Sequence, residues 1–122
     1  LEQQFTLQQR HRAAAYAAPE RWIVTLHGRR AGCFEVDRPG AELRMIELAL
    51  APPFRHQGIG TGLLAALTAE ADALGLPVRL HVEPVNPAIR LYARHGFEPE
   101  AEAPPYLRMV RPARRTVVST PA

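Results

Sequence analysis

The sequence predicts a single α/β domain, residues 1–122, built on one mixed sheet, and three observations predict it. Short apolar segments joined by tight turns occupy residues 21–51, which favours an antiparallel meander. A long helical pattern follows, and a further apolar segment comes directly after it, so the strands on either side of that helix should be parallel. A length of 122 residues suits one domain with a modest core, with residues 112–122 as a tail.

The N-terminal segment Leu1–Ala18 is rich in Gln, Arg and Ala, which have high helix propensity. We therefore expect a helix over Leu1–Ala18, ended by Pro19. The segments that follow are rich in β-branched and aromatic residues and are separated by Gly- and Pro-containing turns. The predicted strands of this meander are Arg21–Leu26, Ala31–Val36 and Leu43–Ala51.

The main helix is predicted over Gly58–Leu74, because apolar residues recur there at a spacing of four. Gly75 suits the position after its last turn. The next strand is predicted at Val78–Val82. Asn86 should cap a second helix with Pro87 at its first position and Gly96 at its end. Phe97 then opens a strand, and Tyr106–Val110 should close the sheet.

Composition excludes several classes of protein. Apolar residues make up 47% of the chain, which is typical of a globular domain. The sequence has neither an apolar run of 18 residues nor a signal-peptide pattern, and its single cysteine, Cys33, cannot form an internal disulfide; we expect a cytoplasmic protein. The net charge of +3 suits an anionic ligand, but no basic run interleaved with aromatics indicates nucleic acid. The histidines show no metal-ligand spacing, so no metal site is predicted.

The segment Gln57–Thr61 has the features of a phosphate-binding turn. A strand is stopped by Pro52 and Pro53, and glycines follow at positions 58, 60 and 62 at the start of a helix. The first N–H groups of a helix have no internal partner, and glycine lets a phosphate approach them. A P-loop would need a lysine, and the chain has none. A Rossmann turn would need a G-x-G-x-x-G spacing and an acidic residue about 20 positions on, where Val78 stands.

Two blocks of sequence carry a resemblance to a known family. Arg55-His56-Gln57-Gly58-Ile59-Gly60 resembles the R/Q-x-x-G-x-G/A signature of the GNAT superfamily of N-acetyltransferases, and the preceding segment 48–52 resembles that family's fourth strand. The segment 86–92, followed by Gly96 and Phe97, resembles the second block, N-x-x-A-x-x-L-Y then G-F. Both blocks stand in order at the usual separation, and the resemblance covers about residues 20–111.

The resemblance implies a GNAT acyl-CoA N-acyltransferase fold with flanking helices, in which two central parallel strands splay apart and acetyl-CoA lies in the opening. Its pantetheine arm would pair with the backbone near Leu48, Ala49 and Leu50, as an added strand does. Its pyrophosphate would sit on the amides of Gln57, Gly58, Ile59, Gly60 and Thr61. Arg55 and His56 would flank the phosphates, and Asn86 would either touch the pantetheine arm or only cap its helix.

The implied reaction is attack of a neutral primary amine on the thioester. Tyr92 stands where many members carry the general acid that protonates the leaving thiolate, and a phenol of ordinary pKa about 10 suits that role; the alternative is a tyrosine that only packs. Glu47 is the first candidate for the base, with His81 and Glu83 as the others. Simple alternation puts Glu47 on the face opposite Leu48 and Leu50, but a bulge in this strand would reset the face.

Three functions remain open at this point. The leading one is an acetyl-CoA-dependent N-acetyltransferase; the others are a non-catalytic acyl-CoA-binding module and an RNA-directed acetyltransferase. The acceptor is expected to be a small-molecule or peptide amine, and a homodimer is compatible with the family. The resemblance also implies a strand and a helix ahead of residue 20, so we expect an N-terminally reduced or truncated domain. Cys33 is expected to be a small buried or half-buried residue without a catalytic role.

Overall fold

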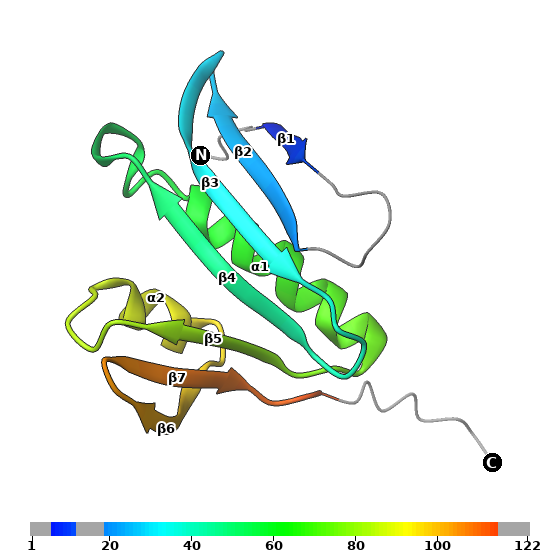
Figure 1. The fold of residues 1–122 in the computed structure, drawn as a ribbon. Coiled ribbons are helices and arrows are strands. Elements are labelled where there is room, and N and C mark those ends of the chain that lie inside the picture. Colours follow the sequence, from blue (N-terminus) through cyan, green and yellow to red (C-terminus); the bar gives the residue numbers. More distant parts are fainter. Residues whose placement is uncertain (1–5, 12–18, 115–122) are drawn as a thin grey trace.

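One seven-stranded sheet organises the described part of the chain, and two helices cover one of its faces (Figure 1). A computed structural model of the chain describes residues 6–11 and 19–114. The strand order is β1-β2-β3-β4-β5-β7-β6. The elements are β1 (Thr6–His11), β2 (Glu20–Leu26), β3 (Arg29–Asp37), β4 (Leu43–Leu50), α1 (Ile59–Leu74), β5 (Val78–Val82), α2 (Ala88–Arg94), β6 (Glu98–Ala103) and β7 (Tyr106–Arg111), with a 3₁₀ turn at Pro52–Phe54.

The predicted antiparallel meander is confirmed for β2, β3 and β4, which pair in sequence order. His27 and Gly28 make the first turn with φ angles of 52° and 74°, the left-handed region that tight hairpins require. Gly40, with φ 106°, makes the second turn. These short connections keep β2, β3 and β4 adjacent and fix their register.

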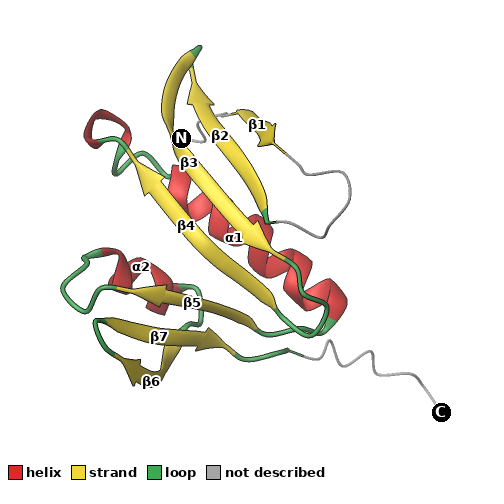
Figure 2. Cartoon of the chain, in the orientation of Figure 1, coloured by secondary structure: helices red, strands yellow, loops and turns green. Residues whose placement is uncertain are grey.

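The helix predicted over Leu1–Ala18 is wrong for Thr6–His11, which form strand β1 (Figure 2). β1 pairs antiparallel with β2, with Thr6 opposite Thr25 and Gln9 opposite Trp22. The backbone edge of β2 pairs with β1 at every residue except Arg10, where the register shifts. This tertiary pairing outweighs a helix propensity of about a few tenths of a kcal/mol per residue. The remainder of the predicted helix, residues 1–5 and 12–18, lies outside the described residues.

α1 spans Ile59–Leu74, as its apolar spacing predicts. It begins after Gly58, whose φ is 81°, and it ends at Gly75, whose φ is 68° and whose N–H bonds the carbonyls of Ala71 and Asp72. The apolar side of α1 packs on the sheet through Ile59, Leu63, Leu64, Leu67 and Ala71, all of them buried. The helix therefore links β4 to the parallel strand β5 across the middle of the core.

The two central parallel strands separate along their length. β4 pairs with β5 only from Leu43 to Met45, opposite Val78 to Leu80. Beyond that point β4 continues to Leu50 beside β3, while β5 turns away toward β7 (Figure 1). The splayed opening implied by the family resemblance is therefore present, and it leaves one edge of β4 without a neighbouring strand in the described chain.

The C-terminal strands differ in one respect from the prediction. Tyr106–Arg111 does not close the sheet; β7 inserts between β5 and β6, and β6 forms the edge. In the hairpin of β6 and β7, either strand could lie next to β5. The strand next to β5 is β7, whose buried Met109 lies opposite the buried Leu80. α2 starts at Ala88, after Pro87, one position later than predicted.

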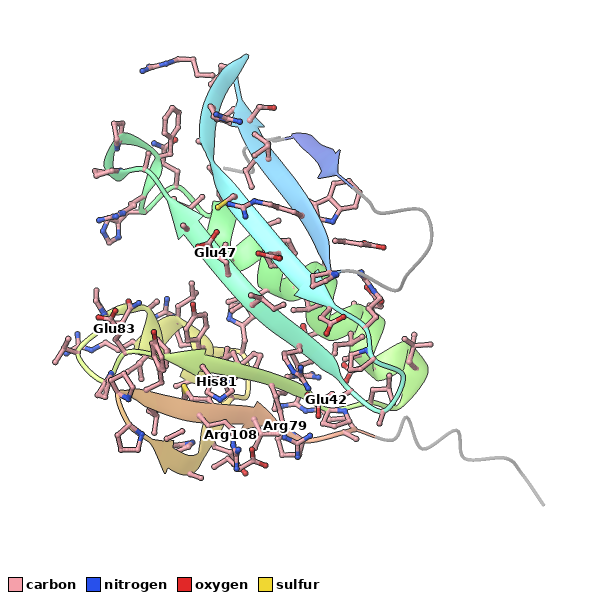
Figure 3. The ribbon with its side chains drawn as sticks, in the orientation of Figure 1. Glu42, Glu47, Arg79, His81, Glu83 and Arg108 are labelled. Carbon is pink, nitrogen blue, oxygen red and sulfur yellow. The ribbon has the colours of Figure 1, made fainter. Side chains whose placement is uncertain are left out.

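Both helices lie on the same face of the sheet. Arg111 on β7 contacts Asp72 on α1 and the carbonyl of His95 at the end of α2, and Leu91 on α2 lies against Gly60 at the start of α1. The opposite face carries no described helix and presents polar side chains, among them Glu47 on β4, Arg79 and His81 on β5, and Arg108 on β7 (Figure 3). The site described next uses both faces of the opening between β4 and β5.

Candidate active site

The loop between β4 and α1 is fixed by its own side chains. Arg55 Nε donates to the carbonyl of Leu50 (2.9 Å), and Gln57 Nε2 donates to the carbonyl of Pro53 (2.7 Å). Phe54 is buried beneath the loop, and His56 takes a φ of 62°. The side chain of Gln57 is thus engaged inside the loop, so any anion contact there would come mainly from backbone amides.

Those amides lie at the start of α1. The first hydrogen bond of the helix runs from the N–H of Gly62 to the carbonyl of Gly58 (2.9 Å), so the N–H groups of Ile59, Gly60 and Thr61 precede the ladder and have no partner within it. The helix dipole adds partial positive charge at this end. A side chain at Gly60 would meet Leu91, 3.2 Å from an added Cβ, whereas one at Gly58 would be strained by the positive φ. The geometry fits an anion held on backbone donors.

The free edge of β4 leads directly to these amides. β4 carries a bulge, because Glu35 lies opposite Glu47 while Val36 lies opposite Met45, which leaves Ile46 as the extra residue. Leu48 and Leu50 turn toward the core and are half-buried. Ile46, Glu47 and Ala49 are exposed. A linear ligand could pair with this edge and reach the start of α1 with its anionic end.

Tyr92 on α2 lies in the hydrophobic core and is 5% exposed. Its ring packs edge to face on Phe97, with 6.0 Å between centroids. Burial raises the pKa of Tyr92 above its ordinary value of 10. The phenol therefore keeps its proton at neutral pH, as a general acid must.

Asn86 has a structural role that the geometry shows directly. Its Oδ1 accepts the N–H of Ala88 at 2.8 Å, at the start of α2. This bond satisfies one of the unpaired donors of the helix start. The capping interpretation of Asn86 is thereby supported, and the side chain's other atom, Nδ2, is the one left for a ligand.

The three candidate bases occupy different surroundings. Glu47 lies on the helix-free face of β4, in contact with Cys33 and Arg21. His81 is exposed on β5, with its ring centroid 6.5 Å from that of Tyr106. Glu83 is exposed just beyond the end of β5. The pairing between β4 and β5 ends at Met45 and Leu80. Glu47 lies two positions beyond Met45 and His81 lies one position beyond Leu80, so these two residues flank the opening between the strands (Figure 3).

The contacts of Glu47 are the part of the site that sequence reasoning missed. Cys33 Sγ lies 2.8 Å from Glu47 Oε1, and Arg21 Nη2 lies 3.6 Å from the same atom. Both partners come from neighbouring strands and share a face with Glu47, since Arg21 lies opposite Glu35 and Glu35 opposite Glu47. Predicting these contacts from the sequence would have required the register of β2, β3 and β4, which depends on the position of the bulge.

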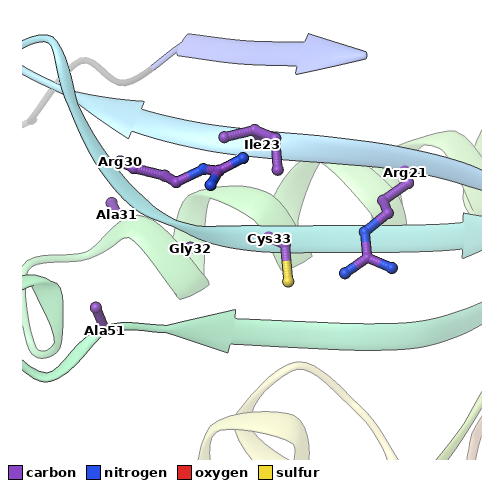
Figure 4. Close-up of a pocket in the computed structure, with 7 residues that line it drawn as sticks. All are labelled: Arg21, Ile23, Arg30, Ala31, Gly32, Cys33 and Ala51. Carbon is purple, nitrogen blue, oxygen red and sulfur yellow. The ribbon is translucent and has the colours of Figure 1, made fainter. Parts of the chain in front are cut away.

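A hollow of about 450 Å³ opens on the helix-free face beside this cluster (Figure 4). Small residues form much of its wall, and two guanidinium groups project over it. Cys33 and Arg21, the two contacts of Glu47, both line it. The complete lining is Arg21, Ile23, Arg30, Ala31, Gly32, Cys33 and Ala51.

Charge is distributed unevenly around the site. No acidic residue occurs between Glu47 and Glu70 in the sequence. The guanidinium of Arg29 lies 5.3 Å from the ring centroid of Phe54. Among the described residues, no carboxylate pairs with Arg29, Arg30 or Arg55. By contrast, Arg38, Arg44, Arg79, Arg108 and Arg111 are all ion-paired. The end of the molecule that carries the β4–α1 loop is therefore positive, which suits an anionic ligand.

Residues 6–11 and 19–114 lack two further features, a metal-binding cluster and a membrane-spanning helix. No group of three or more His, Cys, Asp or Glu side chains there could hold a metal ion. Neither described helix has the length and apolar character that crossing a bilayer requires.

Several solved structures have the same fold as this chain. PaiA N-acetyltransferase from Thermoplasma acidophilum, determined in complex with coenzyme A, matches with a TM-score of 0.67 and 21% identity over 75% of this chain and 59% of that one. The ribosomal-protein-S18-alanine N-acetyltransferase from Escherichia coli matches with a TM-score of 0.73 and 19% identity over 98% and 100%. Arabidopsis thaliana Naa50, in complex with the bisubstrate analogue CoA-Ac-MVNAL, matches with a TM-score of 0.62 and 21% identity over 74% and 70%.

At these identities the structural matches show the fold alone, and the chain spans 59% of the length of the PaiA structure. The sequence itself supplies the stronger evidence. The model of the acetyltransferase (GNAT) domain family matches residues 18–99, well over half of the 122-residue chain. The chain therefore belongs to the GNAT acetyltransferase domain family.

Proposed function

We propose that this protein is an acetyl-CoA-dependent N-acetyltransferase that transfers an acetyl group to a primary amine within a ternary complex. One observation carries the proposal: the free edge of β4 from Ile46 to Leu50 runs directly into the unpaired amides of Ile59, Gly60 and Thr61. This arrangement offers a strand-like arm main-chain partners and offers a pyrophosphate backbone donors. The CoA complex of PaiA, which has the same fold, supports this choice of donor.

The residues of the opening have complementary roles in this reaction. Glu47 takes a proton from the acceptor ammonium, directly or through a water molecule, and the nitrogen lone pair attacks the thioester carbonyl carbon. The carbon–sulfur bond breaks as the tetrahedral adduct collapses. Tyr92 protonates the departing thiolate, because its buried phenol holds its proton at neutral pH. The adduct nitrogen loses a second proton as it becomes an amide, and that proton returns to the Tyr92 phenolate through water. The products are then the amide, free CoA and the proton held by Glu47.

The acceptor class follows from less direct support. The S18-alanine acetyltransferase acts on a protein, and Naa50 was determined with an analogue that carries a peptide. The helix-free face of this chain is open beside Glu47, where the hollow of about 450 Å³ lies. We therefore place peptide and protein N-termini first among the acceptors to be screened, with polyamines and amino acids after them.

Calorimetric titration of acetyl-CoA and desulfo-CoA tests the donor site. We expect binding to the wild type and its loss in Gly60→Glu, which places a carboxylate at the amides of α1 and against Leu91. Ala65→Glu adds the same charge at an exposed position farther along α1 and should bind normally. Equal binding by both variants would show that the start of α1 does not hold the pyrophosphate.

A turnover assay distinguishes an enzyme from a non-catalytic acyl-CoA-binding module. The wild type should convert acetyl-CoA to free CoA in the presence of an alanine-initiated hexapeptide or spermidine. Chromatography of the two CoA species measures this conversion. Binding without turnover across the whole amine panel would contradict the proposed reaction while leaving the donor site intact.

A further inference from the structure

The carboxylate of Glu47 is held through one of its two oxygens. The Cys33 thiol lies 2.8 Å from Oε1, and the guanidinium of Arg21 lies 3.6 Å from that same oxygen. Within residues 6–11 and 19–114, Oε2 accepts no hydrogen bond. The two partners thus fix the orientation of the carboxylate while one oxygen keeps its lone pairs available.

The thiol is suited to be a donor here rather than a nucleophile. Burial, followed by the hydrogen bond to Glu47 and the charge of Glu47, raises the pKa of the Cys33 thiol above its ordinary value of 9.0. Cys33 therefore stays protonated at neutral pH and donates its S–H to Oε1 of Glu47. A thiolate, the form that attacks electrophiles, is disfavoured at this position.

Arg21 balances the negative charge of the cluster. Its guanidinium also lies 3.9 Å from Glu35, which is the cross-strand neighbour of Glu47. Two carboxylates directly opposite each other on adjacent strands repel, and a shared cation offsets that repulsion. The charged or titratable groups that face Glu47 are then Arg21 on β2 and Cys33 and Glu35 on β3, with His81 on β5 across the opening.

We propose that Cys33 and Arg21 are positioning residues for acetyl transfer, which hold Oε1 of Glu47 so that Oε2 is free to take the proton of the acceptor amine. The bulge at Ile46 is what brings Glu47 level with Glu35 and onto the face of its two partners. The hollow lined by Cys33 and Arg21 gives the acceptor its approach from the helix-free face (Figure 4). This inference rests on the proposed function.

The first experiment measures turnover, with acetyl-CoA as donor and the alanine-initiated hexapeptide and spermidine as acceptors. Cys33→Ala and Arg21→Gln should each lower kcat about fivefold to tenfold, which is less than the roughly 10²-fold or larger loss expected when a general base itself is removed. The KM for acetyl-CoA should stay within about twofold, because neither residue touches the donor site. Cys33→Ser, which keeps a donor at this position, should recover most of kcat.

Arg44→Gln is the matched control for Arg21→Gln. Arg44 is an exposed arginine of the same sheet, and it pairs with Asp37 and Glu42 away from the opening. Its replacement should leave kcat unchanged. If Cys33→Ala and Arg21→Gln behave like Arg44→Gln in an active enzyme, the positioning roles are refuted while the proposed function stands.

The second experiment detects the Cys33–Glu47 contact without any turnover. Cys33 is the single cysteine of the chain, so the rate of alkylation by iodoacetamide, followed by mass spectrometry at pH 8, reports on one thiol. Glu47→Gln removes two of the causes that raise the thiol pKa, so alkylation should become at least about twofold faster. The Glu98→Gln variant, altered at a distant exposed carboxylate of β6, should react at the wild-type rate.

The two experiments separate the possible failures. An unchanged alkylation rate in Glu47→Gln would show that the thiol does not contact the carboxylate, which overturns the inference. A faster rate together with a wild-type kcat in Cys33→Ala would show a contact without a positioning role, which also overturns it. Absence of turnover in the wild type, with acetyl-CoA still bound, refutes the proposed reaction and the positioning role with it.

Discussion

Arg111 and Asp72 form a two-armed ion pair that joins β7 to α1, with Nη1–Oδ1 and Nη2–Oδ2 distances of 2.8 and 3.1 Å. The side chain of Arg111 is almost completely buried, and its Nε also donates to the carbonyl of His95. A single guanidinium thus connects β7, the last described strand, with the ends of α1 and α2. The face of the sheet that supports the opening depends on this connection.

Replacing Asp72 by Asn should destabilise the fold, because the buried guanidinium would lose its counter-charge. Breaking a fully buried pair costs about 3–5 kcal/mol, and since Asp72 is partly exposed we expect about 2 kcal/mol, or a decrease in Tm of about 8 °C. Glu70→Gln is the control, because its partner Arg38 is more exposed and such pairs contribute about 0–1 kcal/mol. Equal effects of the two variants in thermal unfolding would contradict this ranking.

The same pair makes stability depend on acidity. The hydrogen bond from Arg111, followed by its charge, holds the pKa of Asp72 below its ordinary value of 3.8. A carboxylate with a depressed folded-state pKa contributes stability that is complete above its unfolded-state pKa and is lost as the pH falls through the folded-state pKa. The wild type should therefore exceed Asp72→Asn in free energy of unfolding by a constant amount between about pH 5 and about pH 7, and by less below about pH 4. Urea unfolding of both proteins across pH measures it; an advantage that persists at pH 2 would argue against the ion pair.

Gly32 should tolerate no side chain. A Cβ built at this residue of β3 would lie 1.9 Å from the carbonyl oxygen of Ala49 on β4, and backbone cannot move aside without breaking the pairing. We expect Gly32→Ala to cost more than about 3 kcal/mol, as an overpacked backbone contact does. Gly40→Ala, at a turn where φ 106° strains a side chain but the space around it is open, should cost less, about 1–2 kcal/mol. Denaturant unfolding compares them, and a small loss in Gly32→Ala would mean that β3 and β4 are less closely apposed.

Tyr92→Phe should separate chemistry from packing. The ring would keep its contact with Phe97, so we expect little change in Tm and acetyl-CoA affinity. If Tyr92 is the general acid, as proposed, kcat should fall about 10²-fold. Tyr106→Phe, at an exposed tyrosine of β7, serves as the matched control and should retain kcat. Undiminished turnover in Tyr92→Phe would assign Tyr92 a packing role only.

Local patterns predicted most of the fold. The apolar spacing of α1, the glycines at its two ends and the Val78–Val82 strand each depend on neighbours in sequence, and the structure confirms all three. β1 and the place of β7 were mispredicted because strand pairing is decided by distant segments. Thr6–His11 has no apolar alternation that marks a strand, and it is the edge of β2 that orders it.

The candidate site divides along the same line. The loop around Gly58 could be identified from sequence, because consecutive residues form it. The surroundings of Glu47 could not, since one extra residue at Ile46 changes which side chains share its face. Neither Cys33 nor Arg21 carries a sequence motif, and their relation to Glu47 exists only in the register of three strands.

The brevity of the β4–β5 pairing has a consequence for how the domain behaves as a whole. Three residue pairs, Leu43 to Met45 against Val78 to Leu80, are the ladder that joins the four-stranded and three-stranded portions of the sheet. A donor lying along β4 would fill the place of the absent neighbour and become a structural member of the sheet for as long as it stays bound. Amide exchange near Leu48 and Val82 should then slow when the donor binds. The resistance of the fold to local opening would then rise with the concentration of the proposed donor.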